Sequence, residues 1–291
     1  MDQAEQLRNL IKANSQPRPV ARVITVTSGK GGVGKSNTAI NLAIQFRKLG
    51  QRVIILDADF GLANIEIMFG AVPKHNLCDL IYQGKNIKEI ITWGPMEVGF
   101  ISGGSGIAGM SNLSRDYLAY IIQNLAALDA IADVIIVDTG AGISDAVLEF
   151  LVASDEVILV TTPEPTSITD SYSLLKALSR HPRFSAENSQ VKMIANKVEK
   201  EEDGYSLFNK LNAVVARYLK MPFSFLGAVP QDSLLNRAVM QQMPVSIQSP
   251  TAKSSMAYET IAAKLMNKDV PLRKRGMAAF FSHIVSAKKM G

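Results

Sequence analysis

The chain has 291 residues, a formal net charge of +5 and a single cysteine, Cys78. This length is sufficient for one large α/β domain with a substantial buried core. One cysteine excludes a disulfide within the chain and a cysteine metal cluster, which suits a reducing cytosol. Residues 1–11 carry charges and lack the apolar core of a secretory signal, and no apolar run approaches the ~20 residues of a membrane-spanning helix. We therefore expect a cytoplasmic protein with at most peripheral membrane contact.

Short β-branched runs alternate with longer helical patterns along most of the chain. The predicted strands cover 23–27, 53–57, 134–138, 157–161 and 191–195, with weaker ones at 98–101 and 225–229. The predicted helices cover 35–49, 114–128, 143–152, 169–178 and 205–219. This alternation predicts an α/β fold, a mostly parallel, twisted sheet covered by helices on both faces. Ligands of such sheets bind at the carboxyl ends of the strands, so the loops that follow strands should carry the chemistry.

Composition also predicts how the chain is divided. Polar residues and prolines at 12–21 indicate a linker, so we assign 1–22 to an N-terminal partner-binding segment and linker. Residues 23–267 form the predicted main domain, and 268–291 a basic linker with an amphipathic helix.

A glycine-rich loop follows the first predicted strand. Residues 29–36, Gly-Lys-Gly-Gly-Val-Gly-Lys-Ser, match GxxxxGK[ST] between a strand and a helix, the context in which this motif binds phosphate. The backbone amides surround phosphate oxygens, the last lysine pairs with the β and γ phosphates, and the serine hydroxyl can ligate Mg²⁺. The alternative, a glycine-rich turn without a ligand, is disfavoured by that context. The predicted nucleotide contacts are Gly29, Gly31, Gly32, Val33, Gly34, Lys35, Ser36 and Asn37.

Carboxylates follow two further predicted strands. Asp57 and Asp59 lie two residues apart after the second strand, so an extended chain points both to the same side. Asp138 ends a run of four apolar residues and precedes a turn with two glycines, a Walker B pattern whose carboxylate belongs near a bound Mg²⁺. Capping of the following turns is the structural alternative for Asp57 and Asp59. A further loop, 195–199 (Ala-Asn-Lys-Val-Glu), approaches the guanine-reading NKxD motif but has Glu199 in place of the aspartate.

Lys30 narrows the class of P-loop protein to which the chain can belong, because an ordinary P-loop does not require a lysine at that position. With it, the loop resembles the deviant Walker A ATPases, the family of MinD, ParA and the nitrogenase iron protein. The resemblance implies an ATP-dependent homodimer in which Lys30 reaches the partner's nucleotide, as an arginine finger does, with Lys35 as a further catalytic residue. A surface lysine that merely neutralises the loop is the alternative.

The same resemblance implies roles for the other motifs. Asp57 matches the aspartate near Mg²⁺, which with Ser36 and Asp138 gives the predicted metal ligands, and Asp59 matches the residue that positions the attacking water. Asn196 and Pro230 match the family's adenine contacts, which favours ATP over GTP. GTP remains the alternative, to be decided by competition binding.

The C-terminal stretch is amphipathic. Basic residues flank an apolar stripe with helical spacing, which suits an interfacial helix on anionic lipid. Two copies in a dimer would bind a membrane better than one, so the protein is expected on the inner face of the cell membrane when it is ATP-bound. A helix docked on the domain is the alternative. The predicted membrane-facing residues are Met277, Phe280, Phe281, Ile284 and Val285.

The N-terminal segment adds a second resemblance. DQAxxLR at 2–8, DADFGLAN at 57–64 and DTGAGI at 138–143 resemble the MinD-type flagellar number regulators, the FlhG, FleN or YlxH group, over essentially the whole chain. This implies that the segment stimulates a signal-recognition-particle-type GTPase, FlhF, and that the chain engages flagellar switch-complex proteins. The implied partner-binding residues are Asp2, Gln3, Leu7 and Arg8.

A ParA-like ATPase that partitions DNA or another cargo is the alternative function. The sequence shows no helix-turn-helix pattern, and its basic residues gather in the tail rather than along a recognition face, which argues against DNA. A salt-sensitive, ATP-dependent gel shift of nonspecific DNA would revive this alternative. A synthetase or reductase finds no support, because no second substrate motif is present and the cysteine needed for an iron–sulfur ligand is lacking.

Overall fold

The computed structural model describes residues 20–59, 64–103, 122–154, 156–187, 189–266 and 276–287. Within these ranges, no helix combines the length and the apolar character that crossing a membrane requires. The predicted partner-binding residues Asp2, Gln3, Leu7 and Arg8 lie outside the described residues, as does most of the helix predicted at 114–128, of which 122–126 are described and helical.

An eight-stranded sheet runs through the described part of the molecule, in the order β3-β4-β2-β5-β1-β6-β7-β8. Neighbouring strands are parallel except for the short edge strand β3, which is antiparallel to β4. The predicted α/β fold is therefore confirmed. The strands are β1 (Arg22–Ser28), β2 (Val53–Ala58), β3 (Thr92–Trp93), β4 (Gly99–Ser102), β5 (Val134–Ala141), β6 (Glu156–Thr161), β7 (Gln190–Val198) and β8 (Phe223–Pro230).

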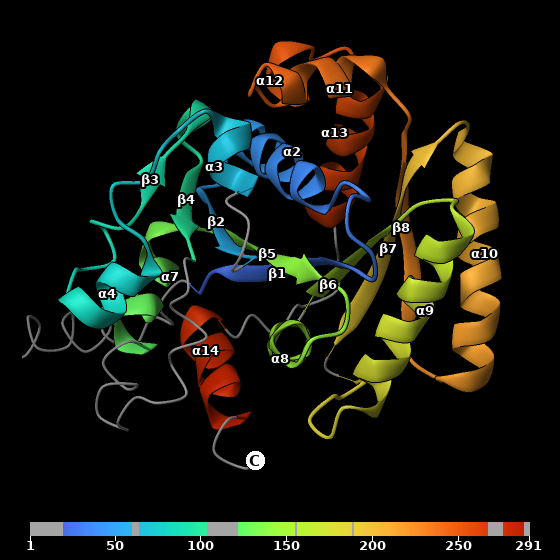
Figure 1. Cartoon of the computed structure of the whole chain (residues 1–291), viewed down its shortest axis with the longest axis horizontal. Coiled ribbons are helices and arrows are strands. Elements are labelled where there is room, and N and C mark those ends of the chain that lie inside the picture. The colour runs from blue at the N-terminus through green and yellow to red at the C-terminus, as the bar shows by residue number, and fades with distance from the viewer. Residues whose placement is uncertain are drawn as a thin grey trace, which may run out of the picture.

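Helices cover both faces of this sheet (Figure 1). On one face, apolar residues of α2 and α13 pack against β1, β2 and β5 in one core cluster, and on the other α8, α9, α10 and α14 cover the sheet in two further clusters. The helical elements are α2 (Lys35–Lys48), α3 (Asn64–Phe69), α4 (Leu77–Gln83), η1 (Pro95–Glu97), α7 (Leu128–Ile131), α8 (Asp145–Ala153), α9 (Pro165–Arg180), α10 (Glu201–Tyr218), α11 (Ser233–Met240), α12 (Val245–Gln248), α13 (Lys253–Met266) and α14 (Gly276–Ala287).

The register of the central strands determines where the predicted chemistry lies. Asp57 on β2 is directly opposite Asp138 on β5, and the end of β1 pairs with the end of β5 just before the glycine-rich loop. Three loops that are far apart in sequence therefore meet at the carboxyl edge of the sheet. This placement is what the parallel topology requires of a ligand site.

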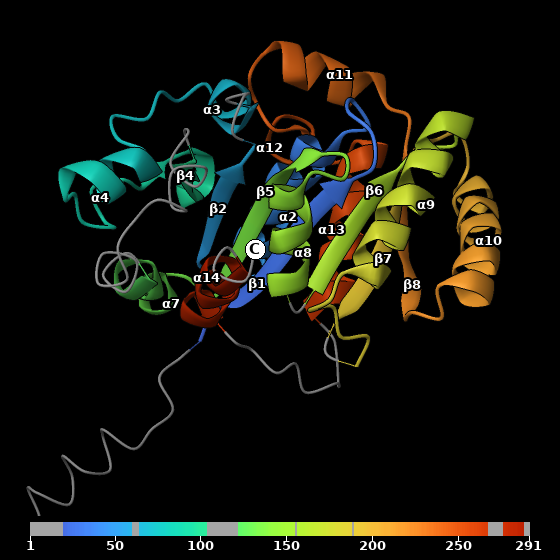
Figure 2. The ribbon, with the colours of Figure 1, turned by 60° about the horizontal axis from the view of Figure 1, so that its bottom comes forward.

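The C-terminal helix α14 lies against the domain, beside α7 and α8 (Figure 2). Met277, Phe280, Phe281 and Ile284 are at most 3% exposed, and Val285 packs against the same cluster. The Phe280 ring stacks on Phe150 of α8 at 5.8 Å between centroids. The stripe that we expected to face lipid therefore faces the domain in this structure, because α8 and the sheet offer it an apolar surface.

Polar contacts anchor both ends of α14. The backbone amide of Met277 donates a hydrogen bond to Asp129 Oδ1 at 3.0 Å, and Arg183 donates to the carbonyl of His283. Arg183 also pairs with Glu149 of α8. The helix is thus fixed to the domain by directional contacts as well as by apolar burial.

Candidate functional site

The glycine-rich loop of residues 29–36, called the phosphate loop from here on, joins β1 to α2. Close packing requires glycine at two of its positions. Gly34 has φ of 95°, a left-handed conformation, and a Cβ there would lie 2.2 Å from the side-chain nitrogen of Asn196. A Cβ on Gly29 would lie 2.3 Å from the carbonyl carbon of Asp170. A side chain at Gly29 would collide with the backbone of α9, and one at Gly34 would displace the Asn196 side chain. The loop therefore presents free backbone and the amino end of α2 to an anion, as a phosphate site requires.

Lys35, Asp57 and Asp138 form a buried charged group beneath this loop. Lys35 Nζ is 3.1 Å from Asp138 Oδ1, and both side chains are at most 8% exposed. Burial, and after it the charge of Asp138, raises the pKa of Asp57 to about 7. Burial also raises the pKa of Asp138, opposed by the nearby Lys35 and Ser36. Two carboxylates held together away from water favour a bound cation, which would stabilise their charged forms.

The donor set fits Mg²⁺. Asp138 Oδ2 is buried and has no hydrogen-bond partner among the described residues. Oxygen donors from one or two carboxylates and a hydroxyl, completed by substrate phosphates, are the usual surroundings of Mg²⁺ at a nucleotide. The predicted ligands Ser36, Asp57 and Asp138 do lie together, and their role as ligands stays a prediction. Mg²⁺ bound there would neutralise charge on the phosphates.

Asp59 extends from the end of β2 toward the turn after β5. Its carboxylate accepts a hydrogen bond from Asn64 at 3.3 Å, and a Cβ on Gly140 would meet its Oδ1 at 3.5 Å. Its own backbone amide donates to Asp57 Oδ1 at 3.1 Å. The carboxylate therefore lies beside Asn64 and Gly140, and its role in positioning the attacking water stays a prediction.

The carboxyl end of β7 holds the phosphate loop through two consecutive side chains. Asn196 Nδ2 donates to the Val33 carbonyl at 2.7 Å, and Lys197 Nζ donates to the Gly32 carbonyl at 2.8 Å. Lys197 adopts φ of 57°, which is uncommon for a residue with a side chain and marks a strained position. The sequence motif indicated Asn196 but not Lys197. Its position inside an NKxE sequence was the available signal.

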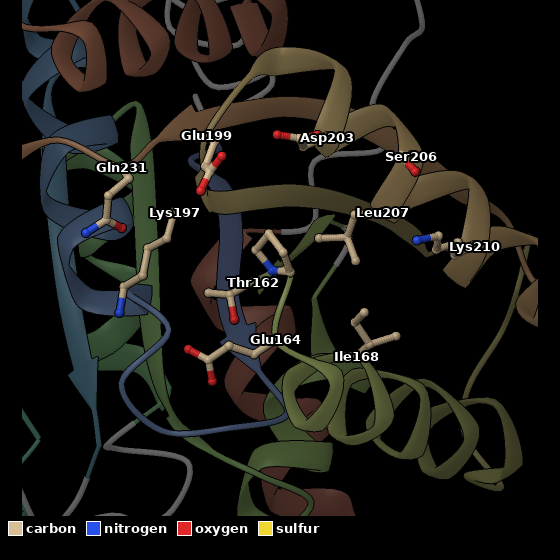
Figure 3. A pocket seen from close by; sticks show the side chains of 11 residues that line it. Thr162, Glu164, Ile168, Lys197, Glu199, Asp203, Ser206, Leu207, Lys210 and Gln231 are labelled. Carbon is tan, nitrogen blue, oxygen red and sulfur yellow. The ribbon is translucent and has the colours of Figure 1, made fainter.

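A cavity of about 420 Å³ lies beside Lys197, between the ends of β6, β7 and β8 and helix α10 (Figure 3). Lys197, Glu199 and Gln231 line it, whereas Pro230 lines a different cavity with Lys253 of α13. Asn196, the other predicted adenine contact, lines neither of these two cavities. The contact of Asn196 and Pro230 with adenine stays a prediction.

Lys30 is held within its own chain. Its Nζ lies 2.8 Å from Glu164 Oε2 and 2.8 Å from Thr166 Oγ1, and both residues are at the start of α9. The cross-dimer role of Lys30 stays a prediction. Sequence reasoning missed Glu164 and Thr166, since no motif marks them and they are far from Lys30 in the chain.

Comparison with known families agrees with this geometry. A family model named ParA, described as NUBPL iron-transfer P-loop NTPase, matches residues 19–266. This chain belongs to the ParA family. The predicted resemblance is confirmed, and as a member of this family the protein is a P-loop ATPase of the MinD type.

Two curated relatives carry flagellar names. Antiactivator FleN of Pseudomonas aeruginosa is 38% identical over 260 residues, which cover 89% of this chain and 91% of that protein. Flagellum site-determining protein YlxH of Helicobacter pylori is 32% identical over 295 residues, which cover 98% of this chain and 98% of that protein. These relatives match the group that the sequence motifs indicated.

Solved structures show the same fold. The MinC:MinD cell division protein complex of Aquifex aeolicus matches with a TM-score of 0.66 and 21% identity, over 88% of this chain and 100% of that one. MinD of Pyrococcus horikoshii, solved with Mg-ADP, matches with a TM-score of 0.66 and 20% identity, over 85% and 96%. At these identities the likeness establishes the fold alone.

The Lys197 contact yields a first prediction. Replacing Lys197 by Met should weaken ATP binding about fivefold, because one hydrogen bond that shapes the phosphate loop is lost. Titration calorimetry with a nonhydrolysable ATP analogue would measure this. Lys210→Met is the matched control, since Figure 3 places Lys210 at the far end of the same cavity. Equal affinities of the two variants would contradict a role for the Lys197 contact.

Proposed function

We propose that this ATPase is a nucleotide-controlled regulator that dimerises when ATP is bound and limits the number or placement of flagella. The proposal of an ATP-dependent dimer rests on the phosphate loop, which carries Lys30 in addition to Lys35 and lies beside the paired aspartates Asp57 and Asp138. The similarity to FleN and to the flagellum site-determining protein YlxH supports the flagellar half. Flagellar switch-complex proteins are proposed as partners.

The N-terminal segment is proposed to activate an FlhF-type GTPase through Asp2, Gln3, Leu7 and Arg8. Its support is the DQAxxLR sequence at 2–8, which precedes the linker to the domain. A short segment of this kind orders mainly on its partner. The three-part division of the chain at residues 22 and 267 is proposed on the same grounds.

Peripheral membrane binding in the ATP state is proposed to use the apolar stripe of α14. Because the domain covers that stripe, the helix must separate from the domain before the stripe can contact lipid. The turn that follows β5 leads directly into α8, and α8 carries Phe150, which stacks on Phe280. Movement of that turn around a γ phosphate would therefore reach α14 through one intervening helix.

The decisive experiment measures GTP hydrolysis by an FlhF-type GTPase alone, with this protein, and with this protein lacking residues 1–11. We expect stimulation by the full chain and none by the truncated chain. A circular dichroism spectrum and ATP binding equal to those of the full chain would show that the truncated domain is intact. Absence of stimulation by the full chain would remove the FlhF role and leave the ATP switch to be tested by itself.

Lys30 allows that separate test. Replacing Lys30 by Ala should leave ATP affinity nearly unchanged while ATP-driven dimerisation is lost, because the side chain is proposed to act on the partner's nucleotide. Light scattering with a nonhydrolysable analogue would follow the mass. A Lys30→Ala protein that dimerises as the wild type does would show that the lysine does not act across the interface.

A further inference from the structure

A cavity of about 510 Å³ lies at the amino end of β2, whereas the nucleotide motifs lie at the carboxyl end. The buried residues Val53 and Ile54 line it, together with Trp93, Ile131 and side chains at the ends of α2 and η1. Its volume is within the roughly 300–1,000 Å³ of ligand sites in proteins. None of the residues that line it belongs to a nucleotide motif, so ATP chemistry does not account for this cavity.

Trp93 gives the cavity an apolar side that is open to water. It is directly opposite Gly99 of β4, where a Cβ would lie 3.2 Å from Trp93 Cζ3 and 3.1 Å from Ile54 Cγ1. The glycine therefore allows the indole to lie close to the neighbouring strand. Trp93 is nevertheless 55% exposed, and covering the remaining apolar surface would be favourable.

The two arginines of the cavity already have carboxylate partners. Arg47 pairs with Glu97 at 2.6 Å, and Arg52 pairs with Asp133 at 2.8 Å. Because both guanidinium groups are engaged, a small anion would have to displace a carboxylate of the protein. An occupant with apolar side chains needs no such exchange and therefore fits this cavity better.

The described part of the chain begins beside this cavity. The amide of Ala21 donates a hydrogen bond to Asp129 Oδ1 at 3.3 Å, and Ile131 follows two residues later in α7. Only β5 separates the start of β1 from the start of β2, so these two starts are two strand spacings, roughly 10 Å, apart. Residues 12–19 can span up to about 30 Å. Residues 1–11 are therefore within reach of the cavity.

We propose that residues 1–11 bind in this cavity of their own chain through the apolar side chains Leu7, Leu10 and Ile11. The spacing i, i+3, i+4 allows these three side chains to lie on one side of a helix. The linker keeps the segment near the cavity at an effective concentration of about 1 mM, so a dissociation constant of about 1 mM leaves half of the chains docked.

Docking of this segment withdraws it from other partners. The apparent affinity of any partner of residues 1–11 falls in proportion to the undocked fraction. The docking itself does not depend on the proposed function, because it requires no second protein. It can therefore be tested without a GTPase, and its failure would leave the flagellar proposal unchanged.

Trp93 reports on docking directly, because it is the one tryptophan of the chain. Replacing Leu10 and Ile11 together by Ser should shift the Trp93 fluorescence to longer wavelength, since the indole loses its apolar cover. Asn9→Ser with Asn14→Ser is the matched control, because it changes two polar residues of the same region and should leave the emission unchanged. Identical emission of the wild type and of the Leu10→Ser, Ile11→Ser variant would overturn the proposal.

A synthetic peptide of residues 1–11 tests the contact from outside the chain. Added to the Leu10→Ser, Ile11→Ser variant, it should restore the wild-type emission with a dissociation constant of about 1 mM or tighter. A peptide that carries the same two replacements should have no effect, and an equal response to both peptides would overturn the proposal. Dilution of the wild type should leave its emission unchanged, whereas a shift to longer wavelength on dilution would assign the segment to a second copy and overturn docking within one chain.

Discussion

Replacing Asp59 by Ala should lower ATP hydrolysis roughly 100-fold or more while ATP binding is retained, since a positioned carboxylate contributes about that much to proton transfer or water orientation. The Asp59 carboxylate lies beside Gly140 and accepts its hydrogen bond from Asn64, which is not part of the phosphate loop. Its loss therefore removes orientation of the attacking water and leaves the phosphate contacts. ATP should then persist, and with it the proposed dimer.

Single-turnover hydrolysis and light scattering would measure the two halves of this prediction. Asp145→Asn is the matched control, because Asp145 is an exposed carboxylate just beyond the turn that follows β5. Hydrolysis within about twofold of the wild type in Asp59→Ala would contradict the role of Asp59. A monomer in the presence of ATP would contradict the trapped dimer while leaving the hydrolysis result intact.

The nucleotide motifs were predictable because each is local in sequence and follows its own strand. The run that ends at Asp57 and the run that ends at Asp138 both read as buried strands, and a parallel sheet then brings their ends together. Gly34 illustrates the same point, since its left-handed backbone is encoded by the residue type itself. The fold class required only the alternation of strands and helices.

The contacts that sequence reasoning missed join residues that are far apart in the chain. Glu164 and Thr166 meet Lys30 only because β6 lies next to β1 in the sheet. Lys197 contacts Gly32 because it lies on β7, the strand next to β6 in the sheet. No periodicity or spacing in a single sequence records such pairs, so they become visible only with the strand order.

Helix α14 shows a different limit. Its spacing correctly predicted a helix with one apolar face, but an apolar stripe has the same pattern whether it faces lipid or protein. The stripe packs against Phe150 of α8 and against apolar residues of the sheet. The direction of the stripe therefore depends on surfaces supplied by distant segments.

The largest expected effect on stability concerns Glu156, at the opposite edge of the sheet from the nucleotide site. Its carboxylate accepts hydrogen bonds from Arg22 and Lys192, and all three residues are at most 7% exposed. Arg22 also donates to the carbonyl of Leu265 near the end of α13. This buried group links the starts of β1 and β6 to β7 and α13.

Replacing Glu156 by Gln should lower the free energy of unfolding by about 3–5 kcal/mol, because the charge of Glu156 beside two buried cations is removed. Burial alone would raise the pKa of Glu156, but Arg22 and Lys192 outweigh it and hold the pKa below its ordinary value. The stabilisation is therefore present above the unfolded pKa and is lost as pH falls through the lower folded value. Urea unfolding at neutral pH and at acidic pH would measure both effects.

Glu97→Gln is the matched control for Glu156→Gln, since it removes the same charge from a pair with Arg47 in which Glu97 is 83% exposed. That variant should lose at most about 1 kcal/mol, because water screens the pair. A loss in Glu156→Gln as small as in Glu97→Gln would mean that Arg22 and Lys192 find other partners or water when the carboxylate is gone. The difference between the two variants therefore measures what burial adds to an ion pair in this sheet.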